Sequence, residues 1–183
     1  MSLFAPASRK YAIPAILMMA IIVLLSNYLV QFPLNDWLTW GAFSYPLSYL
    51  VTDVVNRLVG PGLARRVVVV GFVLAVLCSI WLATPRIAAA SGAAFLFSQL
   101  TDIEVFNRLR RSRWWIAPLS SNTVAACLDT VIFWGIAFVG VSEHWLSWAV
   151  GDLMVKLAMA TLVILPFRLL TRRKAGVPLE WRR

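Results

Sequence analysis

The chain has 183 residues, of which 61% are hydrophobic, and its mean hydropathy is +0.79. Soluble domains are only about 45–50% apolar, so the excess of apolar side chains indicates a protein surrounded by lipid. At about 20 residues per membrane crossing, the membrane helices leave no length for a separate catalytic domain. The formal net charge of +9 does not indicate a nucleic-acid partner, because the basic residues cluster in short gaps between apolar segments, where they orient helices and contact lipid phosphates.

Six apolar runs predict six transmembrane helices. The first begins at Tyr11 and continues to about Phe32; it is longer than the apolar region of a signal peptide and no small-residue cleavage site follows, so we expect a retained helix. The other runs cover about Trp37–Leu58, Arg66–Thr84, Ile87–Leu109, Trp114–Gly140 and Trp145–Leu170. Strands are not expected, because an open sheet cannot satisfy its backbone in lipid.

The fold class that follows is an all-α, polytopic membrane protein. Its expected parts are a cytoplasmic tail at residues 1–10, a six-helix transmembrane domain at 11–170 and a basic cytoplasmic tail at 171–183. If six helices alternate from a cytoplasmic N-terminus, 15 of the 17 basic residues fall on the inner side, and the outer side holds only Arg86. This positive-inside bias predicts that both termini are cytoplasmic in a multi-pass inner-membrane protein.

Polar residues inside the apolar runs recur at helical spacing. Helix by helix they are Asn27 and Gln31; Tyr45, Tyr49, Thr52, Asp53 and Asn56; Ser91, Ser98, Gln99 and Asp102; Asn122 and Asp129; and Asp152 and Lys156. Each set falls on one face of its helix. Charged groups at mid-bilayer are costly and normally face a bundle interior or a watery cavity. We therefore expect these faces to be buried together around a shared interior.

Some of these residues also have a purely structural interpretation. Asn27 and Ser98 suit interhelical hydrogen bonds, which are common in membrane proteins. Asp152 and Lys156, four residues apart, are spaced for an intrahelical ion pair whose charges neutralise each other. Both interpretations stay open beside a functional one.

Three aspartates are harder to explain as structural. Asp53, Asp102 and Asp129 lie inside predicted helices that hold too few cations to neutralise them all. A cavity or a ligand is the better explanation. Carboxylates and amides match the donor and acceptor edges of a planar heterocycle, and neighbouring aromatic rings offer stacking faces.

A series of short motifs resembles a known family. The motifs are Ser26-Asn27-Tyr28-Leu29-Val30-Gln31, Thr39-Trp40-Gly41-Ala42-Phe43-Ser44, Thr52-Asp53, Leu63-Ala64-Arg65-Arg66, Gln99 with Asp102, Val105-Phe106-Asn107-Arg108-Leu109-Arg110, Trp114-Trp115 with Ala117-Pro118, Asp129-Thr130, Glu143-His144-Trp145, Asp152 and Lys156. In this order, over residues 26–170, they resemble the YhhQ group of queuosine precursor transporters in the vitamin uptake transporter (VUT) family. The chain departs from that group at Tyr45, Tyr49 and Asn122 and in a shorter connection between the third and fourth helices.

The resemblance implies an importer of 7-cyano-7-deazaguanine and its 7-aminomethyl analogue, salvaged for the tRNA nucleoside queuosine. It also implies a fold like the substrate-binding subunits of energy-coupling-factor transporters, working without their ATPase module, and neither a cofactor nor a metal. Together with the polar faces it gives these candidates for substrate binding or transport: Asn27, Tyr45, Asp53, Gln99, Asp102, Asn122, Asp129, Asp152 and Lys156.

The expected transport path follows the polar faces from outside to inside. We expect the substrate to stack on Tyr45 or a neighbouring aromatic residue, to be held by Asp129 and Gln99, and to leave past Asp53 and Asp102. Those two acids lie nearer the cytoplasmic end and are candidates to take up a proton. A transporter or binding subunit for another purine-like or vitamin solute, energised by a partner, is the alternative, and a homo-oligomer stays open.

An enzyme is not expected. Aspartates on separate helices are typical of intramembrane aspartyl proteases, but the flanking Tyr-Asp and Gly-x-Gly-Asp motifs are missing. The sequence also holds no P-loop, histidine cluster or pair of nucleophile and base. Cys78 and Cys127 lie inside apolar runs without metal-type spacing, so no metal site is indicated.

Overall fold

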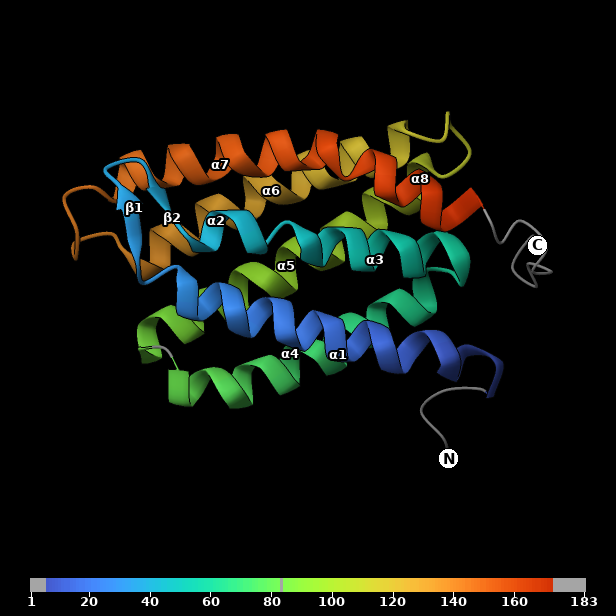
Figure 1. Cartoon of the computed structure of the whole chain (residues 1–183), viewed down its shortest axis with the longest axis horizontal. Helices are drawn as coiled ribbons and strands as arrows, with labels where there is room; N and C mark the ends of the chain where they lie inside the picture. Colours follow the sequence, from blue (N-terminus) through green and yellow to red (C-terminus); the bar gives the residue numbers. More distant parts are fainter. Residues whose placement is uncertain (1–5, 83, 173–183) are drawn as a thin grey trace.

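The computed structural model describes residues 6–82 and 84–172, which form a helical bundle (Figure 1). Its elements are α1 (Pro6–Leu29), β1 (Pro33–Asn35), β2 (Leu38–Thr39), α2 (Gly41–Ser44), α3 (Leu47–Leu58), α4 (Pro61–Leu82), α5 (Pro85–Leu109), α6 (Ile116–Ala137), α7 (Trp145–Leu162) and α8 (Ile164–Arg172). The start of α1 and the end of α8 lie at the same end of the bundle (Figure 1). Helix α1 takes in residues 6–10 of the expected N-terminal tail, while residues 1–5 and 173–183 of the expected tails lie outside the described residues.

The second expected helix, Trp37–Leu58, is wrong at its start and is divided into α2 and α3. Residues 33–39 form an antiparallel hairpin instead, which corrects the expectation that the chain has no strands. The side-chain Oδ1 of Asn35 accepts hydrogen bonds from the backbone N–H groups of Trp37 and Leu38, at 2.8 and 2.9 Å. This is the local turn that asparagine favours over helix. The hairpin is short; β1 is exposed, whereas in β2 Leu38 is half-buried and Thr39 is buried.

Two prolines divide expected helices. Pro46 separates α2 from α3, because proline cannot donate a backbone hydrogen bond and its ring clashes with the preceding turn. Pro166 has the same effect on the sixth expected helix, which breaks at Val163 between α7 and α8. The two pieces still form one continuous apolar span from Trp145 to Thr171.

The distribution of polar and apolar side chains is inverted relative to a soluble protein. Leu17, Val131 and Met154 are 55%, 73% and 64% exposed, whereas Asp53, Gln99 and Asp102 are at most 1% exposed. Within the described residues, three spans are long and apolar enough to cross a membrane, namely Tyr11–Leu29, Ile116–Ala137 and Trp145–Thr171. An all-α, multi-pass membrane protein is therefore confirmed in its coarse form.

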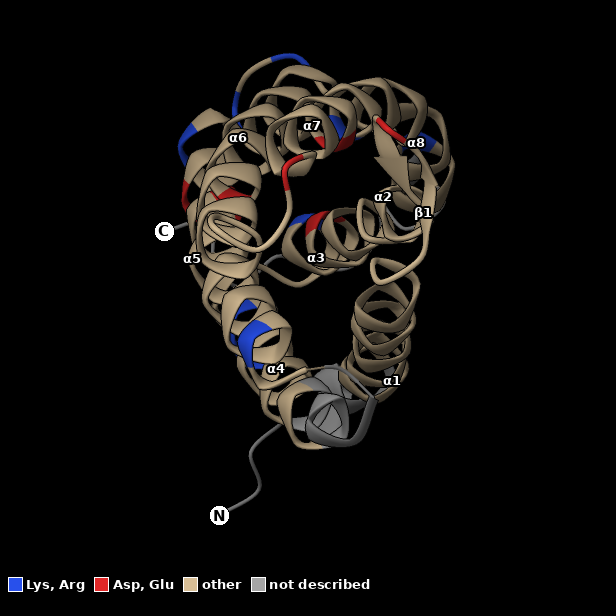
Figure 2. Ribbon diagram, turned by 90° about the vertical axis from the view of Figure 1, so that its left-hand side faces the viewer, with Lys and Arg blue, Asp and Glu red and all other residues tan. Residues whose placement is uncertain are grey.

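Helix α3 is the most enclosed helix and carries the polar face predicted for it. It packs against α1, α4, α5 and α8 (Figure 2). Its buried residues include Ser48, Tyr49, Thr52, Asp53 and Asn56. Helices α5 and α6 form the most extensive pair, and their buried faces meet this polar face and the buried face of α7. The predicted burial of polar faces around one interior is confirmed.

Candidate functional site

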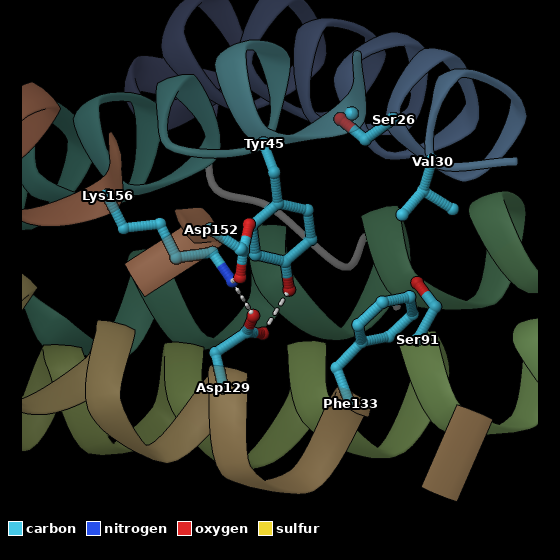
Figure 3. Close-up of a pocket in the computed structure, with 9 residues that line it drawn as sticks. Ser26, Val30, Tyr45, Ser91, Asp129, Phe133, Asp152 and Lys156 are labelled. Atoms are coloured by element: carbon cyan, nitrogen blue, oxygen red, sulfur yellow. Dashed lines mark hydrogen bonds and ion pairs between the residues drawn. The ribbon is translucent and has the colours of Figure 1, made fainter. Parts of the chain in front are cut away.

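A pocket lies between α1, α2, α5, α6 and α7, toward the hairpin end of the bundle (Figure 3). Its lining residues are Ser26, Val30, Gly41, Tyr45, Ser91, Asp129, Phe133, Asp152 and Lys156. The pocket therefore brings together four of the nine residues singled out from the sequence, and it adds a second aromatic ring from Phe133.

Lys156 is the cation that joins the charged side chains of the pocket. Its Nζ donates hydrogen bonds to Asp129 Oδ2 at 2.6 Å, to Thr130 Oγ1 at 3.3 Å and to Asp152 Oδ2. The ammonium also lies 5.2 Å from the centre of the Tyr45 ring, within the range of a cation–π contact. The predicted pair of Asp152 and Lys156 is thus confirmed, and it is part of a larger cluster that reaches α6.

Asp129 accepts hydrogen bonds from three side chains. The Tyr45 hydroxyl donates to Asp129 Oδ1 at 2.7 Å and the Ser98 hydroxyl donates to the same oxygen at 3.3 Å, while Lys156 binds the other oxygen. Hydrogen bonds of this kind to an ionised carboxylate are stronger than neutral ones. The carboxylate therefore joins α6 to α5, α7 and the end of α2.

Asp152 has one oxygen engaged and one available. Its Oδ2 accepts from Thr130, from Trp134 Nε1 at 3.1 Å and from Lys156. Among the described residues, none donates a hydrogen bond to its Oδ1. The sequence analysis named Thr130 only within a motif and did not single out Trp134, although Trp134 follows Thr130 by four residues and so shares its helix face.

The pocket is closed in this conformation. The free volume between the lining side chains is about 30 Å³, which has room for a water molecule, whereas pockets for small organic ligands have about 300–1,000 Å³. The Tyr45 side chain extends into the pocket and its hydroxyl meets Asp129 (Figure 3). A ligand the size of a purine therefore needs Tyr45 or a neighbouring helix to move.

Two other candidates act as links between helices. Gln99 donates from Nε2 to Ser48 Oγ at 2.9 Å and accepts from Thr52 Oγ1 at 2.6 Å, which ties α5 to α3. Asn27 accepts from Ser91 Oγ at 2.6 Å, which ties α1 to α5. Gln99 lies outside the pocket, and Asn27 touches it through Ser91.

The remaining three candidates form a second cluster. Asp53 on α3, Asp102 on α5 and Asn122 on α6 are at most 2% exposed. The two carboxyl groups interact electrostatically with each other, and Asn122 lies beside Asp53. We call Asp53, Asp102 and Asn122 the inner cluster. Asn122 precedes Asp129 by seven residues, so the inner cluster lies about 10 Å along the bundle from the pocket.

Two arginines make hydrogen bonds next to the inner cluster, where α3 and α5 end. Arg110 Nη2 donates to the backbone oxygen and to Oδ1 of Asn56, at 2.6 and 2.5 Å. Arg57 donates to the backbone oxygen of Arg110 at 3.2 Å. Burial, together with the charge of Arg57, lowers the pKa of Arg110 to about 10, so this guanidinium stays protonated at neutral pH.

The hairpin is fastened to α7 above the pocket. The Ser147 hydroxyl donates to the backbone oxygen of Asp36 at 2.5 Å and Trp148 Nε1 donates to that of Asn35 at 3.0 Å. Gly151 makes the approach possible, because a Cβ there would overlap the backbone oxygen of Trp37. Sequence reasoning missed this contact, and the available signal was a glycine one residue before Asp152.

Comparison with known proteins finds similarity along most of the chain. Residues 39–84 and 79–171 match the family described as "Putative vitamin uptake transporter". The chain is 35% identical to the "Queuosine precursor transporter" of Escherichia coli (strain K12), over 91% of this chain and 89% of that protein. It is 33% identical to the "Probable queuosine precursor transporter" of Haemophilus influenzae, over 79% of each chain. No solved structure matches the chain.

Proposed function

Because the chain belongs to the queuosine precursor transporters of the vitamin uptake transporter family, we propose that it imports 7-cyano-7-deazaguanine and 7-aminomethyl-7-deazaguanine. We propose further that it does so across the bacterial inner membrane, with six spans and both termini in the cytoplasm. The names of the relatives support the substrate class, and the common end of α1 and α8 supports the even number of spans.

The observation that carries the proposal is the charge of the closed pocket. Asp129 and Asp152 share one cation, Lys156, so the pocket holds one more carboxylate than it holds ammonium groups. A 7-deazaguanine presents its ring N–H and its amino group as adjacent donors, which a carboxylate can accept together. Asp152 Oδ1 is the available acceptor, and Lys156 can donate to the ring carbonyl oxygen once it releases its 3.3 Å hydrogen bond to Thr130.

The aromatic side chains supply the rest of the binding energy. Tyr45 and Phe133 line the same pocket and offer faces for stacking a planar bicyclic base. The 7-aminomethyl analogue adds an ammonium group, which compensates the pocket's excess carboxylate. We therefore expect this analogue to bind at least as tightly as the neutral cyano compound.

Binding requires an opening step. The Tyr45 hydroxyl donates a hydrogen bond to Asp129 Oδ1, and the pocket is too small for a base while this hydrogen bond is present. In the proposed cycle the base displaces the Tyr45 hydroxyl, stacks on the ring and takes its place on the carboxylate. Gln99 acts by fixing α5 to α3 rather than by touching the base.

The experiment is uptake in cells that cannot synthesise 7-deazaguanines, read as queuosine in their tRNA. With the wild-type chain, supplied 7-cyano-7-deazaguanine should restore queuosine, and guanine in excess should not compete. Asp129→Asn should abolish the recovery at matched membrane expression, whereas Glu104→Gln, on the exposed ion pairs with Arg65 and Arg108, should not. A well-expressed wild-type chain that restores nothing contradicts the proposed substrate.

One alternative has a specific observation in its favour. The matching family is described by vitamin uptake rather than by queuosine, so another purine-like or vitamin solute, handled by this chain as a binding subunit with an energising partner, is the second candidate. Uptake by the purified chain alone in lipid vesicles excludes the need for such a partner. Competition by a vitamin but not by a deazaguanine favours this alternative.

A further inference from the structure

The inner cluster differs from the pocket in how its charge is compensated. In the pocket, Lys156 lies between two carboxylates. In the inner cluster Asp53 and Asp102 interact with each other, and no ion pair joins either of them to a described lysine or arginine. Two like charges in a buried site repel each other and lose their hydration, so both cannot stay ionised without a cation from outside.

Unused polar groups point to a ligand at this position. Both oxygens of Asp102 and Oδ1 of Asp53 are buried without a hydrogen bond among the described residues. Asn122, on a third helix and 2% exposed, lies beside Asp53, as Ser121 lies beside Asp102. Within the part of the chain that the structure describes, neither amide atom of Asn122 makes a hydrogen bond of ordinary geometry. Buried polar groups are rarely left unpaired, so their coincidence in one cluster indicates a site rather than a packing fault.

We propose that Asp53, Asp102 and Asn122 form a proton-binding site on the cytoplasmic side of the pocket, and that one proton passes through it with each substrate. The proposal rests on the transport function proposed above. The proton binds a carboxylate oxygen of the pair after entering from the outside and leaves to the cytoplasm, so only an O–H bond forms and breaks.

A buried tyrosine connects the proton-binding site to the pocket, and two arginines lie on its other side. The Tyr49 hydroxyl is buried near Ser98, and among the described residues it has no hydrogen bond of ordinary geometry. It interacts electrostatically with both Asp129 and Asp102, which connects it to both clusters. Toward the cytoplasm, the Asn56 contact with Arg110 closes the site, and the charge of Arg57 lies beside Arg110.

The remaining charged groups near these helices are engaged elsewhere. On α5, Glu104 is half-exposed and paired with Arg65 of α4 and Arg108. On α8, Arg168 lies over the Trp114 ring at 4.4 Å. On α7, Asp152 and Lys156 bind each other and α6. The carboxyl pair is therefore the group that can exchange a proton without breaking an ion pair.

The test uses the full chain in lipid vesicles with labelled 7-cyano-7-deazaguanine and no sodium. With one proton carried per substrate, a gradient of one pH unit, acid outside, sustains about tenfold accumulation. The wild type should reach this ratio and lose it when a protonophore is added. Asp102→Asn should bring the ratio to about one, while Glu104→Gln, a carboxylate on the same helix, should keep the wild-type ratio.

Two outcomes overturn the proposal directly. One is Asp102→Asn that still accumulates substrate in response to the pH gradient; the other is wild-type accumulation that follows a sodium gradient at equal pH. A second readout needs no substrate: infrared spectra of the purified chain in lipid should contain the band of a protonated buried carboxyl group at neutral pH. The band should vanish in the double variant Asp53→Asn/Asp102→Asn and persist in Glu104→Gln.

The two readouts separate this inference from the proposed function. If the wild type fails to transport the deazaguanine in any condition, the proposed substrate is wrong and the infrared band alone decides the proton site. If the wild type transports the base but lacks the band, the proton site is wrong and the substrate assignment stands.

Discussion

Lys156 Nζ lies 2.6 Å from Asp129 Oδ2, although the two residues are 27 positions apart and belong to different helices. This contact converts an intrahelical pair with Asp152 into a cluster that joins α6 to α7. A buried pair of charges adds little to stability compared with apolar packing, so the cluster is better explained by ligand binding. The predictions below separate its structural role from its functional one.

Removing the Tyr45 hydroxyl should tighten substrate binding. In Tyr45→Phe the ring remains for stacking, but the hydrogen bond to Asp129 that closes the pocket is lost. That bond to a charged group contributes about 1.5–3 kcal/mol, so we expect an apparent KM lowered by about tenfold or more. Tyr45→Ala, which also removes the stacking face, should raise KM. Uptake kinetics at matched expression give both values, and changes of the same sign in the two variants contradict the proposed opening step.

Removing the shared cation should destabilise the bundle. Lys156→Gln leaves two buried carboxylates without their shared cation, which costs about 3–5 kcal/mol. The double variant Asp129→Asn/Lys156→Gln restores the original net charge of the cluster, so it should recover much of the folding stability without recovering uptake. Denaturation of the purified variants measures stability. A double variant that transports normally contradicts the functional role of the cluster.

The hairpin should be displaced when the glycine beneath it is replaced. In Gly151→Ala the new methyl group meets the backbone oxygen of Trp37, and overpacking of this kind costs about 1–3 kcal/mol. We expect faster hydrogen exchange at the backbone N–H groups of Trp37 and Leu38. Gly135→Ala is the matched control, because nothing lies within 4 Å of a Cβ at that helical position. Equal protection of the hairpin in both variants contradicts the proposed contact.

Arg86 should stabilise the end of α6. Its Nε and Nη2 donate to the backbone oxygens of Ile136 and Val139, at 2.6 and 2.7 Å, where the last carbonyls of a helix lack partners and the helix dipole favours a cation. Arg86→Ala should cost about 1 kcal/mol, whereas Arg86→Lys should retain part of this stabilisation. Thermal unfolding compares the two variants. An unchanged midpoint in Arg86→Ala is the contrary result.

The sequence allowed the polar interior to be predicted, because helical periodicity alone places residues on a face. It placed Asp152 beside Lys156 for the same reason, since residues four apart on one helix are neighbours. It could not pair Tyr45 with Asp129, which are 84 positions apart. That pairing depends on how each helix is rotated and which helix lies next to it, and both are decided by packing across the bundle.

Local conformation was missed where a side chain competes with the helix. The apolar content of residues 37–58 favoured one helix, but Asn35 turns the chain before residue 40 and Pro46 separates α2 from α3. Arg86 was noted only as the lone basic residue outside, and its capping of α6 became evident from the structure. The two polar clusters were predicted as one interior, and only tertiary structure separates a pocket with a lysine from a carboxyl pair without one.

Binding of 7-cyano-7-deazaguanine to the purified chain in detergent or lipid tests the central claim most directly. We predict saturable binding by the wild type and by Glu104→Gln. Asp129→Asn and Asp152→Asn should each weaken it at least about tenfold, because a hydrogen bond to a buried charge is lost. Wild-type affinity in both aspartate variants would contradict the assignment of the Asp129–Lys156–Asp152 pocket as the substrate site.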